Sequence, residues 1–241
     1  MKKSVSKIFT VLALTVMFSA TAIAQNYQEI RALGLFPIGS YGRVGATEEM
    51  YKDQIIGSGA AIGAGLGYRY SFDLSMGVTF IVGGDVLWNM TNADYRRICS
   101  ENNGQAAPMY FNVPLSVGVG LNYQLGRSPW SVFFDATAGL NIHYTTSTGW
   151  RNFEVQYKPV LSPALSAEVA MRYRNFSFGF QLLSLGSPTM KIASGEEIHH
   201  DPICKVDEQK RTMLMGNIVL SYKLAKTKKE WRPSRKTILD S

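Results

Sequence analysis

Three side chains have the types that acyl-transfer chemistry uses, namely the Ser162 hydroxyl, the His143 imidazole and the Asp85 carboxylate. A serine hydroxyl becomes a nucleophile when a neighbouring base accepts its proton, and a third group orients that base. All three fall on the polar faces of alternating segments, near Asn112 and Tyr110. No motif connects them, and a histidine among polar neighbours commonly has a structural role. A catalytic site is therefore the less favoured hypothesis.

A second group of ligand-type side chains lies in residues 196–201, where His199 and His200 are flanked by carboxylates. Imidazole and carboxylate groups bind zinc, but their spacing here matches no established zinc site. We expect a solvated loop, with no metal and no other cofactor.

The segments that must position these side chains alternate apolar and polar residues with a period of two, as β-strands do. The clearest covers residues 109–125, in which nine odd-numbered apolar residues oppose eight even-numbered, mostly small or polar ones. We predict eight strands, over residues 28–38, 58–70, 75–88, 109–125, 130–144, 161–173, 176–186 and 212–224.

The connections between these strands are alternately short and long. Residues 71–74, 126–129 and 174–175 are short, and residues 39–56, 89–108, 145–160 and 187–211 are long. An outer-membrane β-barrel has short periplasmic turns and long external loops in this order. We therefore predict an all-β, eight-stranded antiparallel up-and-down transmembrane barrel over residues 25–224, with periplasmic N- and C-termini.

A soluble barrel with an apolar interior is the alternative, and two features of the sequence oppose it. The face predicted to line the lumen carries too many charges for a soluble core. These are Arg31, Arg69, Asp85, Asp135, Glu168, Arg172 and Lys223, with Glu29 as a candidate addition. The apolar face ends in aromatic residues, as both membrane interfaces require. They are Tyr70, Tyr123, Trp130, Tyr173, Phe176 and Tyr222 at the short-turn end, and Trp88, Phe111 and Tyr144 at the other.

The lumen of an eight-stranded barrel is just wide enough for side chains to fill. The lumen charges nearly balance, which suggests ion pairs that hold the barrel closed, since an unpaired buried charge is costly. We expect a plugged lumen, and a small gated pore is the alternative. The inner face of the second strand carries only small residues, namely Gly57, Gly59, Ala61, Gly63, Gly65 and Gly67. These glycines either make room for large side chains or line a pocket for an acyl chain.

The N-terminus has the pattern of a secretory signal peptide. Basic residues precede an apolar stretch and the small-residue site at Ala22 and Ala24. We expect residues 1–24 to be removed and the rest of the chain to be exported.

Both cysteines, Cys99 and Cys204, fall in long connections. In an oxidising compartment two such cysteines most economically pair. Loops of this length reach across the barrel mouth. We predict a disulfide between them, with two free thiols as the alternative.

The formal charge of +7 comes from the two ends of the chain, since residues 25–224 are neutral overall. Residues 225–241 form a basic tail, which could bind an anionic surface. A periplasmic tail excludes nucleic acid and leaves peptidoglycan, lipid headgroups or a periplasmic protein. A mobile, solvated tail is the favoured interpretation.

As a pattern, residues 25–224 resemble the eight-stranded outer-membrane barrels of the OmpA/OmpX type, including barrel-domain proteins of Bacteroidetes. The last strand ends its apolar alternation in Tyr222, which looks like the family's C-terminal assembly signal, although 17 residues follow Leu224. The resemblance implies the outer membrane of a Gram-negative bacterium, contact with lipid and lipopolysaccharide, and insertion by the barrel assembly machinery. We expect a non-enzymatic protein of the cell envelope that acts structurally or through its loops. A lipid-A hydrolase or acyltransferase and a small gated channel are the alternatives.

Overall fold

The structure is a computed structural model of the 241-residue chain. It describes residues 26–42, 45–46, 55–56, 59–75, 77–93, 96–97, 107–126, 128–146, 148–150, 153–188, 192–194 and 212–224. The residues of the predicted signal peptide, Cys99, Cys204, the histidine pair and the basic tail lie outside these residues. The expectations for them therefore stay predictions.

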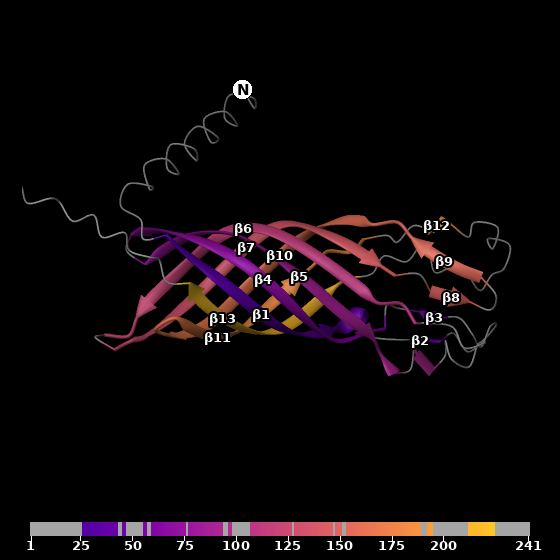
Figure 1. The fold of residues 1–241 in the computed structure, drawn as a ribbon, viewed down its shortest axis with the longest axis horizontal. Coiled ribbons are helices and arrows are strands. Elements are labelled where there is room, and N and C mark those ends of the chain that lie inside the picture. Colours follow the sequence, from indigo (N-terminus) through magenta and orange to yellow (C-terminus); the bar gives the residue numbers. More distant parts are fainter. Residues whose placement is uncertain are drawn as a thin grey trace, which may run out of the picture.

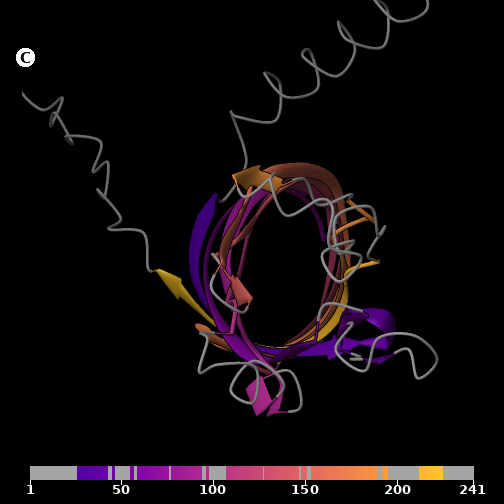
Figure 2. The same cartoon turned by 90° about the vertical axis from the view of Figure 1, so that its right-hand side faces the viewer.

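Eight long strands close into a barrel, seen along its axis in Figure 2. They are β1 (Tyr27–Ile38), β4 (Ala60–Ser75), β5 (Val78–Thr91), β6 (Tyr110–Gln124), β7 (Trp130–Thr145), β10 (Val160–Tyr173), β11 (Phe176–Ser184) and β13 (Leu214–Leu224). Each strand pairs antiparallel with its neighbours along the chain, and β1 pairs with β13 to close the ring. The predicted all-β, eight-stranded up-and-down barrel is confirmed.

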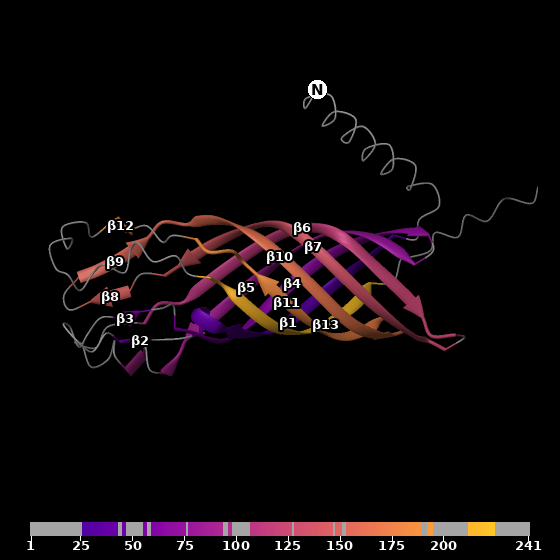
Figure 3. The same ribbon diagram turned by 180° about the vertical axis from the view of Figure 1, so that it is seen from behind.

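The two ends of the barrel differ. Gln28 at the start of β1 pairs with Leu224 at the end of β13, so the barrel begins and finishes at the same end, together with the short connections. We call it the turn end and the opposite one the loop end. The 3-10 helix η1 (Gly39–Tyr41) lies at the rim of the loop end, and beyond this end lie short strands that were not predicted from the sequence (Figures 1 and 3). These strands are β2 (Gly45–Ala46), β3 (Ile55–Ile56), β8 (Thr148–Trp150), β9 (Phe153–Tyr157) and β12 (Ile192–Ser194). Because β9 pairs with both β8 and β12, the third and fourth long connections share one small sheet.

The predicted turn over residues 71–74 is wrong. The ladder between β4 and β5 continues to Ser75, opposite Val78. Phe72 pairs with Phe80 across it, with ring centroids 6.0 Å apart, and such cross-strand aromatic pairs stabilise a sheet. The turn instead uses Gly77, whose φ of +79° is accessible at little cost only to glycine.

The two faces of the barrel wall carry opposite kinds of side chain. On the outside, Leu66, Leu121 and Leu161 are 66%, 59% and 68% exposed. The alternate, inward positions hold buried carboxylates, guanidinium groups and amides. A water-soluble barrel buries its apolar face, so this distribution is inverted.

In the part of the chain that the structure describes, no helix is both long enough and apolar enough to cross a membrane.

The lumen as candidate functional site

Seven charged side chains from five strands meet in the turn-end half of the lumen. Each occupies an inward position of its strand, and each is no more than 8% exposed. They are Glu29 and Arg31 of β1, Arg69 of β4, Asp85 of β5, Asp135 of β7, and Glu168 and Arg172 of β10. We call them the charge network.

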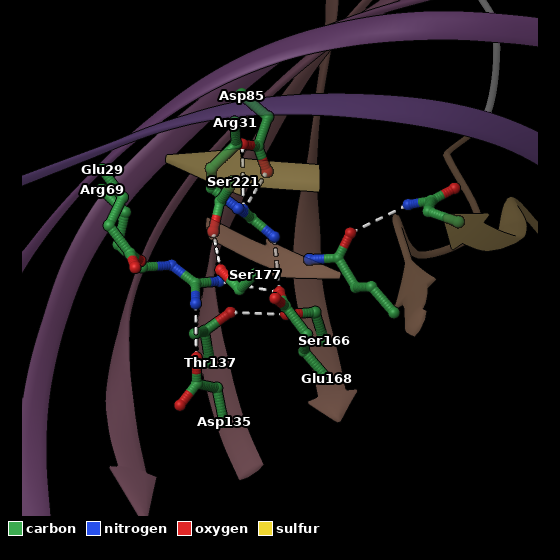
Figure 4. A network of polar contacts seen from close by, with 12 residues as sticks. Glu29, Arg31, Arg69, Asp85, Asp135, Thr137, Ser166, Glu168, Ser177 and Ser221 are labelled. Atoms are coloured by element: carbon green, nitrogen blue, oxygen red, sulfur yellow. Dashed lines mark hydrogen bonds and ion pairs between the residues drawn. The ribbon is translucent and has the colours of Figure 1, made fainter. Parts of the chain in front are cut away.

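Glu168 is the centre of the charge network (Figure 4). Its Oε2 accepts hydrogen bonds from Arg31 Nη2 at 2.5 Å and from Arg69 Nη2 at 3.0 Å. Arg31 Nη1 also donates to both carboxylate oxygens of Asp85, at 3.1 and 3.2 Å. Arg69 Nη1 donates to Asp135. Two arginines thus bridge three carboxylates, and each contact is a charge-assisted hydrogen bond of the stronger kind.

These ion pairs cross the lumen instead of following the wall. In the closed ring, β4 and β10 lie on opposite walls, and the Arg69–Glu168 contact joins them directly. Arg31 joins β1 to both β5 and β10, and none of these strands are neighbours in the ring. The charge network therefore connects strands that share no backbone hydrogen bonds.

The remaining pair of the charge network joins Arg172 and Glu29. The Arg172 guanidinium carbon lies 5.2 Å from the centre of the Tyr27 ring and 4.7 Å from that of Phe133. Lys223, predicted to belong to the lumen network, is half-buried, and its Nζ lies 4.0 Å above the Tyr27 ring. Lys223 thus lies at the edge of the charge network, while Glu29 lies inside it.

Apolar side chains fill the loop-end half of the lumen. This apolar layer contains Leu33, Leu35, Ala60, Leu87, Ala164, Leu183, Leu185, Met213, Met215 and Val219, with Tyr41 and Tyr110. Tyr41 comes from η1 and is only 1% exposed, with its ring 6.1 Å from that of Tyr110. A side chain from outside the barrel wall therefore helps to fill the mouth. Tyr41 could not be identified from the sequence, because a single tyrosine in a long connection carries no periodic signal.

Buried amides surround His143 in the same half. Asn112 Oδ1 lies 2.8 Å from His143 Nδ1 and accepts a hydrogen bond from Asn141 Nδ2 at 3.0 Å. His143 Nε2 lies 3.0 Å from the Thr145 hydroxyl, and Asn141 Nδ2 also donates to Ser162 Oγ at 3.3 Å. Both ring nitrogens of the histidine therefore have hydrogen-bond partners within this amide cluster.

Two of the three candidate catalytic residues, His143 and Ser162, belong to the amide cluster, and the third does not. The Asp85 carboxylate is bound by Arg31 in the turn-end half. Asp85 thus serves in the charge network and not as the group that orients His143. Among the described residues, no three His, Cys, Asp or Glu side chains are grouped so that they could hold a metal ion.

The glycines of β4 lie where inward side chains of β5 need space. A Cβ atom at Gly67 would lie 1.8 Å from Asp85 Oδ1, and one at Gly65 would lie 2.6 Å from Leu87 Cδ2. These positions are thus filled by the neighbouring strand, as the space-making interpretation expects.

The aromatic residues predicted at the two rims lie on the outer face. Seven of the nine are exposed, while Tyr70 and Phe111 are half-buried. At the loop end, Trp88, Phe111 and Tyr144 are aligned across three strands. At the turn end, Trp130 contacts Tyr173 and Phe176 contacts Tyr222, each with ring centroids 4.8 Å apart.

No family model matches the chain, and no curated protein matches it. Among solved structures, the chain is similar to Neisserial surface protein A, at 12% identity and a TM-score of 0.46, over 83% of this chain and 97% of that one. It is also similar to a major outer membrane protein from Thermus thermophilus, at 14% identity and a TM-score of 0.46, over 83% of this chain and 99% of that one. A third similarity is to the N-terminal β-barrel domain of Pseudomonas aeruginosa OprF, at 10% identity and a TM-score of 0.38, over 84% and 100% of the two chains.

Proposed function

We propose that this protein is an integral barrel of the outer membrane of a Gram-negative bacterium, with a closed lumen. The observation that carries the proposal is the inverted wall, in which large apolar side chains face outward and ion pairs lie inside. Hydrocarbon is the environment that such an exterior requires, and a closed barrel leaves no unpaired backbone edge in it. The aligned aromatic residues at both rims suit the two membrane interfaces.

The turn end faces the periplasm in this proposal, and the loop end faces outward. Short turns at one end and long connections at the other are the usual arrangement in outer-membrane barrels. The small sheet of β8, β9 and β12 then stands outside the membrane. A role in the envelope, either structural or through this external part, follows from the closed lumen.

The filling of the lumen supports a non-conducting barrel over a small channel. The charge network joins opposite walls in one half, and the apolar layer with Tyr41 fills the other. A lipid-modifying enzyme has less support, since the ring nitrogens of His143 have partners in Asn112 and Thr145.

Membrane fractionation combined with electrophoresis of unheated and heated samples tests the proposal. We expect the protein in the outer-membrane fraction, and the unheated form should migrate differently from the heated form because the closed barrel resists detergent. Recovery in the soluble fraction would contradict the proposal. We call this difference in migration the gel shift. Deleting residues 148–157 should leave the gel shift unchanged if the barrel folds without the external sheet.

A further inference from the structure

On the outer wall at the turn end, two aligned rows of side chains border a furrow of about 650 Å³. Strand register places the members of each row side by side across neighbouring strands. The first row is Trp130, Tyr173, Phe176, Tyr222 and Ile30. The second row is Met171, Phe178, Leu220, Ala32 and Leu66. The furrow between them is lined almost wholly by apolar and aromatic groups.

The furrow runs obliquely away from the turn between β10 and β11. Trp130, Tyr173 and Phe176 are the terminal residues of their strands at this end, whereas Leu66 lies well inside β4. A row that follows the register is perpendicular to the strands, and strands of a barrel tilt by roughly 35–45° from its axis. The furrow therefore starts at the rim and runs obliquely into the hydrocarbon zone, along a path that a flexible acyl chain can follow from the rim. Ala32, the smallest side chain of the second row, leaves room deep in the furrow.

The positively charged side chain of Arg174 lies at the rim, where the furrow begins. The Arg174 guanidinium carbon lies 5.4 Å from the centre of the Tyr173 ring, within the range of a cation–π contact. The side chain is exposed. Neighbouring backbone fixes the turn, since Arg174 N–H donates to the Pro129 carbonyl at 3.2 Å and Lys223 N–H donates to the Asn175 carbonyl at 2.7 Å.

The backbone of Arg174 indicates that this arginine is not required by the turn itself. Its φ is +54°, the only positive φ of a non-glycine residue in the described part of the chain. Glycine adopts this conformation without steric cost, so a two-residue hairpin turn would form more easily with glycine here. An arginine that is held in an unfavourable conformation and stacked over a rim aromatic points to a role in binding.

We propose that the furrow and Arg174 together bind one anionic glycerophospholipid from the leaflet at the turn end. The guanidinium donates to the phosphodiester and attracts the net negative charge of the headgroup, and one acyl chain lies between the two rows. This inference rests on the proposed membrane location. It goes further because it assigns a selective lipid site to one face of the wall.

The test compares two lipids with the same acyl chains, phosphatidylglycerol and phosphatidylcholine, in native mass spectrometry of the refolded full-length barrel. We expect the wild type to bind phosphatidylglycerol about three- to fivefold more tightly, as one basic residue near a membrane surface provides. Arg174→Gly should abolish the preference while leaving the gel shift intact, because glycine suits the turn. Arg174→Lys should retain part of the preference. Lys158→Gln, which removes an exposed cation near the loop end, is the matched control and should retain all of it.

A second pair of variants tests the furrow. Ala32→Phe fills it and should weaken the binding of both lipids. Ala138→Phe adds the same ring on the outer face of β7, away from the furrow, and should not. Equal affinity of the wild type for the two lipids would overturn the inference. So would an equal loss of lipid preference in Arg174→Gly and Lys158→Gln. An equal loss of lipid affinity in Ala32→Phe and Ala138→Phe would also overturn it. A protein that gives no gel shift contradicts the proposed function instead, before any lipid is measured.

Discussion

In the turn-end half of the lumen, ion pairs join strands from opposite walls, whereas in the loop-end half apolar side chains fill the centre and amides link neighbouring strands. Glu168 contacts Arg31 and Arg69 from two other strands, neither of them adjacent to its own. His143, Asn112 and Asn141 lie on adjacent strands, β6 and β7. The same small barrel thus uses long-range charge contacts at one end and local packing at the other.

The difference has an energetic consequence. Removing one member of a buried ion pair leaves its partner charged and unpaired, which costs more than the contact itself contributed. Removing an apolar side chain leaves a cavity whose cost depends on how far its neighbours relax. We therefore expect single substitutions to be more damaging in the charge network than in the apolar layer or the amide cluster.

The largest effect is expected for Glu168→Gln, which leaves Arg31 and Arg69 short of a carboxylate. The free energy of unfolding should fall by about 3–5 kcal/mol. This free energy is measured from the loss of the gel shift as the urea concentration is raised. Gln181→Ala is the control, since Gln181 lies beside Glu168 in the register but makes a neutral bond to Asn217. It should cost about 1 kcal/mol. Equal losses in the two variants would remove the distinction between the halves.

The apolar layer is tested by Leu87→Ala, for which we expect a loss of about 2–4 kcal/mol in the same titration. Gly65→Ala alone should cost about 1–3 kcal/mol, because its new Cβ meets Leu87 Cδ2. The two changes together should cost less than their sum, since the new methyl group enters the space that Leu87 leaves. Strict additivity would show that the two side chains do not compete for one space.

In the amide cluster, His143→Ala should lower the free energy of unfolding by about 1–3 kcal/mol, because Asn112 and Thr145 each lose a partner. Mass spectra of lipid A from cells that express the variant should match those from cells that express the wild type. A changed lipid-A spectrum would show that His143 has a catalytic role and not only a structural one.

The smallest effect is expected at the edge of the charge network, for Lys223→Met. Lys223 is a half-buried residue whose ammonium group lies over the Tyr27 ring, so we expect a loss of about 0.5–1 kcal/mol. A loss as large as that of Glu168→Gln would show that Lys223 is a full member of the charge network, as predicted from the sequence.

The strands and the residues that face the lumen could be predicted from the sequence. Each residue of the wall faces either outward or inward, which produces a period of two. Alternation alone put Arg31, Asp135 and Glu168 on the inner face. The pairing of those charges could not be read from the sequence, because it depends on the tilt and stagger of the strands around the ring. Tyr41 and the short strand β9 could not be predicted for a related reason, since the position of each depends on contacts with distant segments.

The proposed function depends most on the lumen being closed. Planar-bilayer recording of the wild-type protein, with insertion verified by the gel shift, tests it directly. We predict no stable openings at any applied voltage, because the charge network and the apolar layer both block the path. Stable openings of constant conductance would contradict the closed lumen and favour the channel hypothesis.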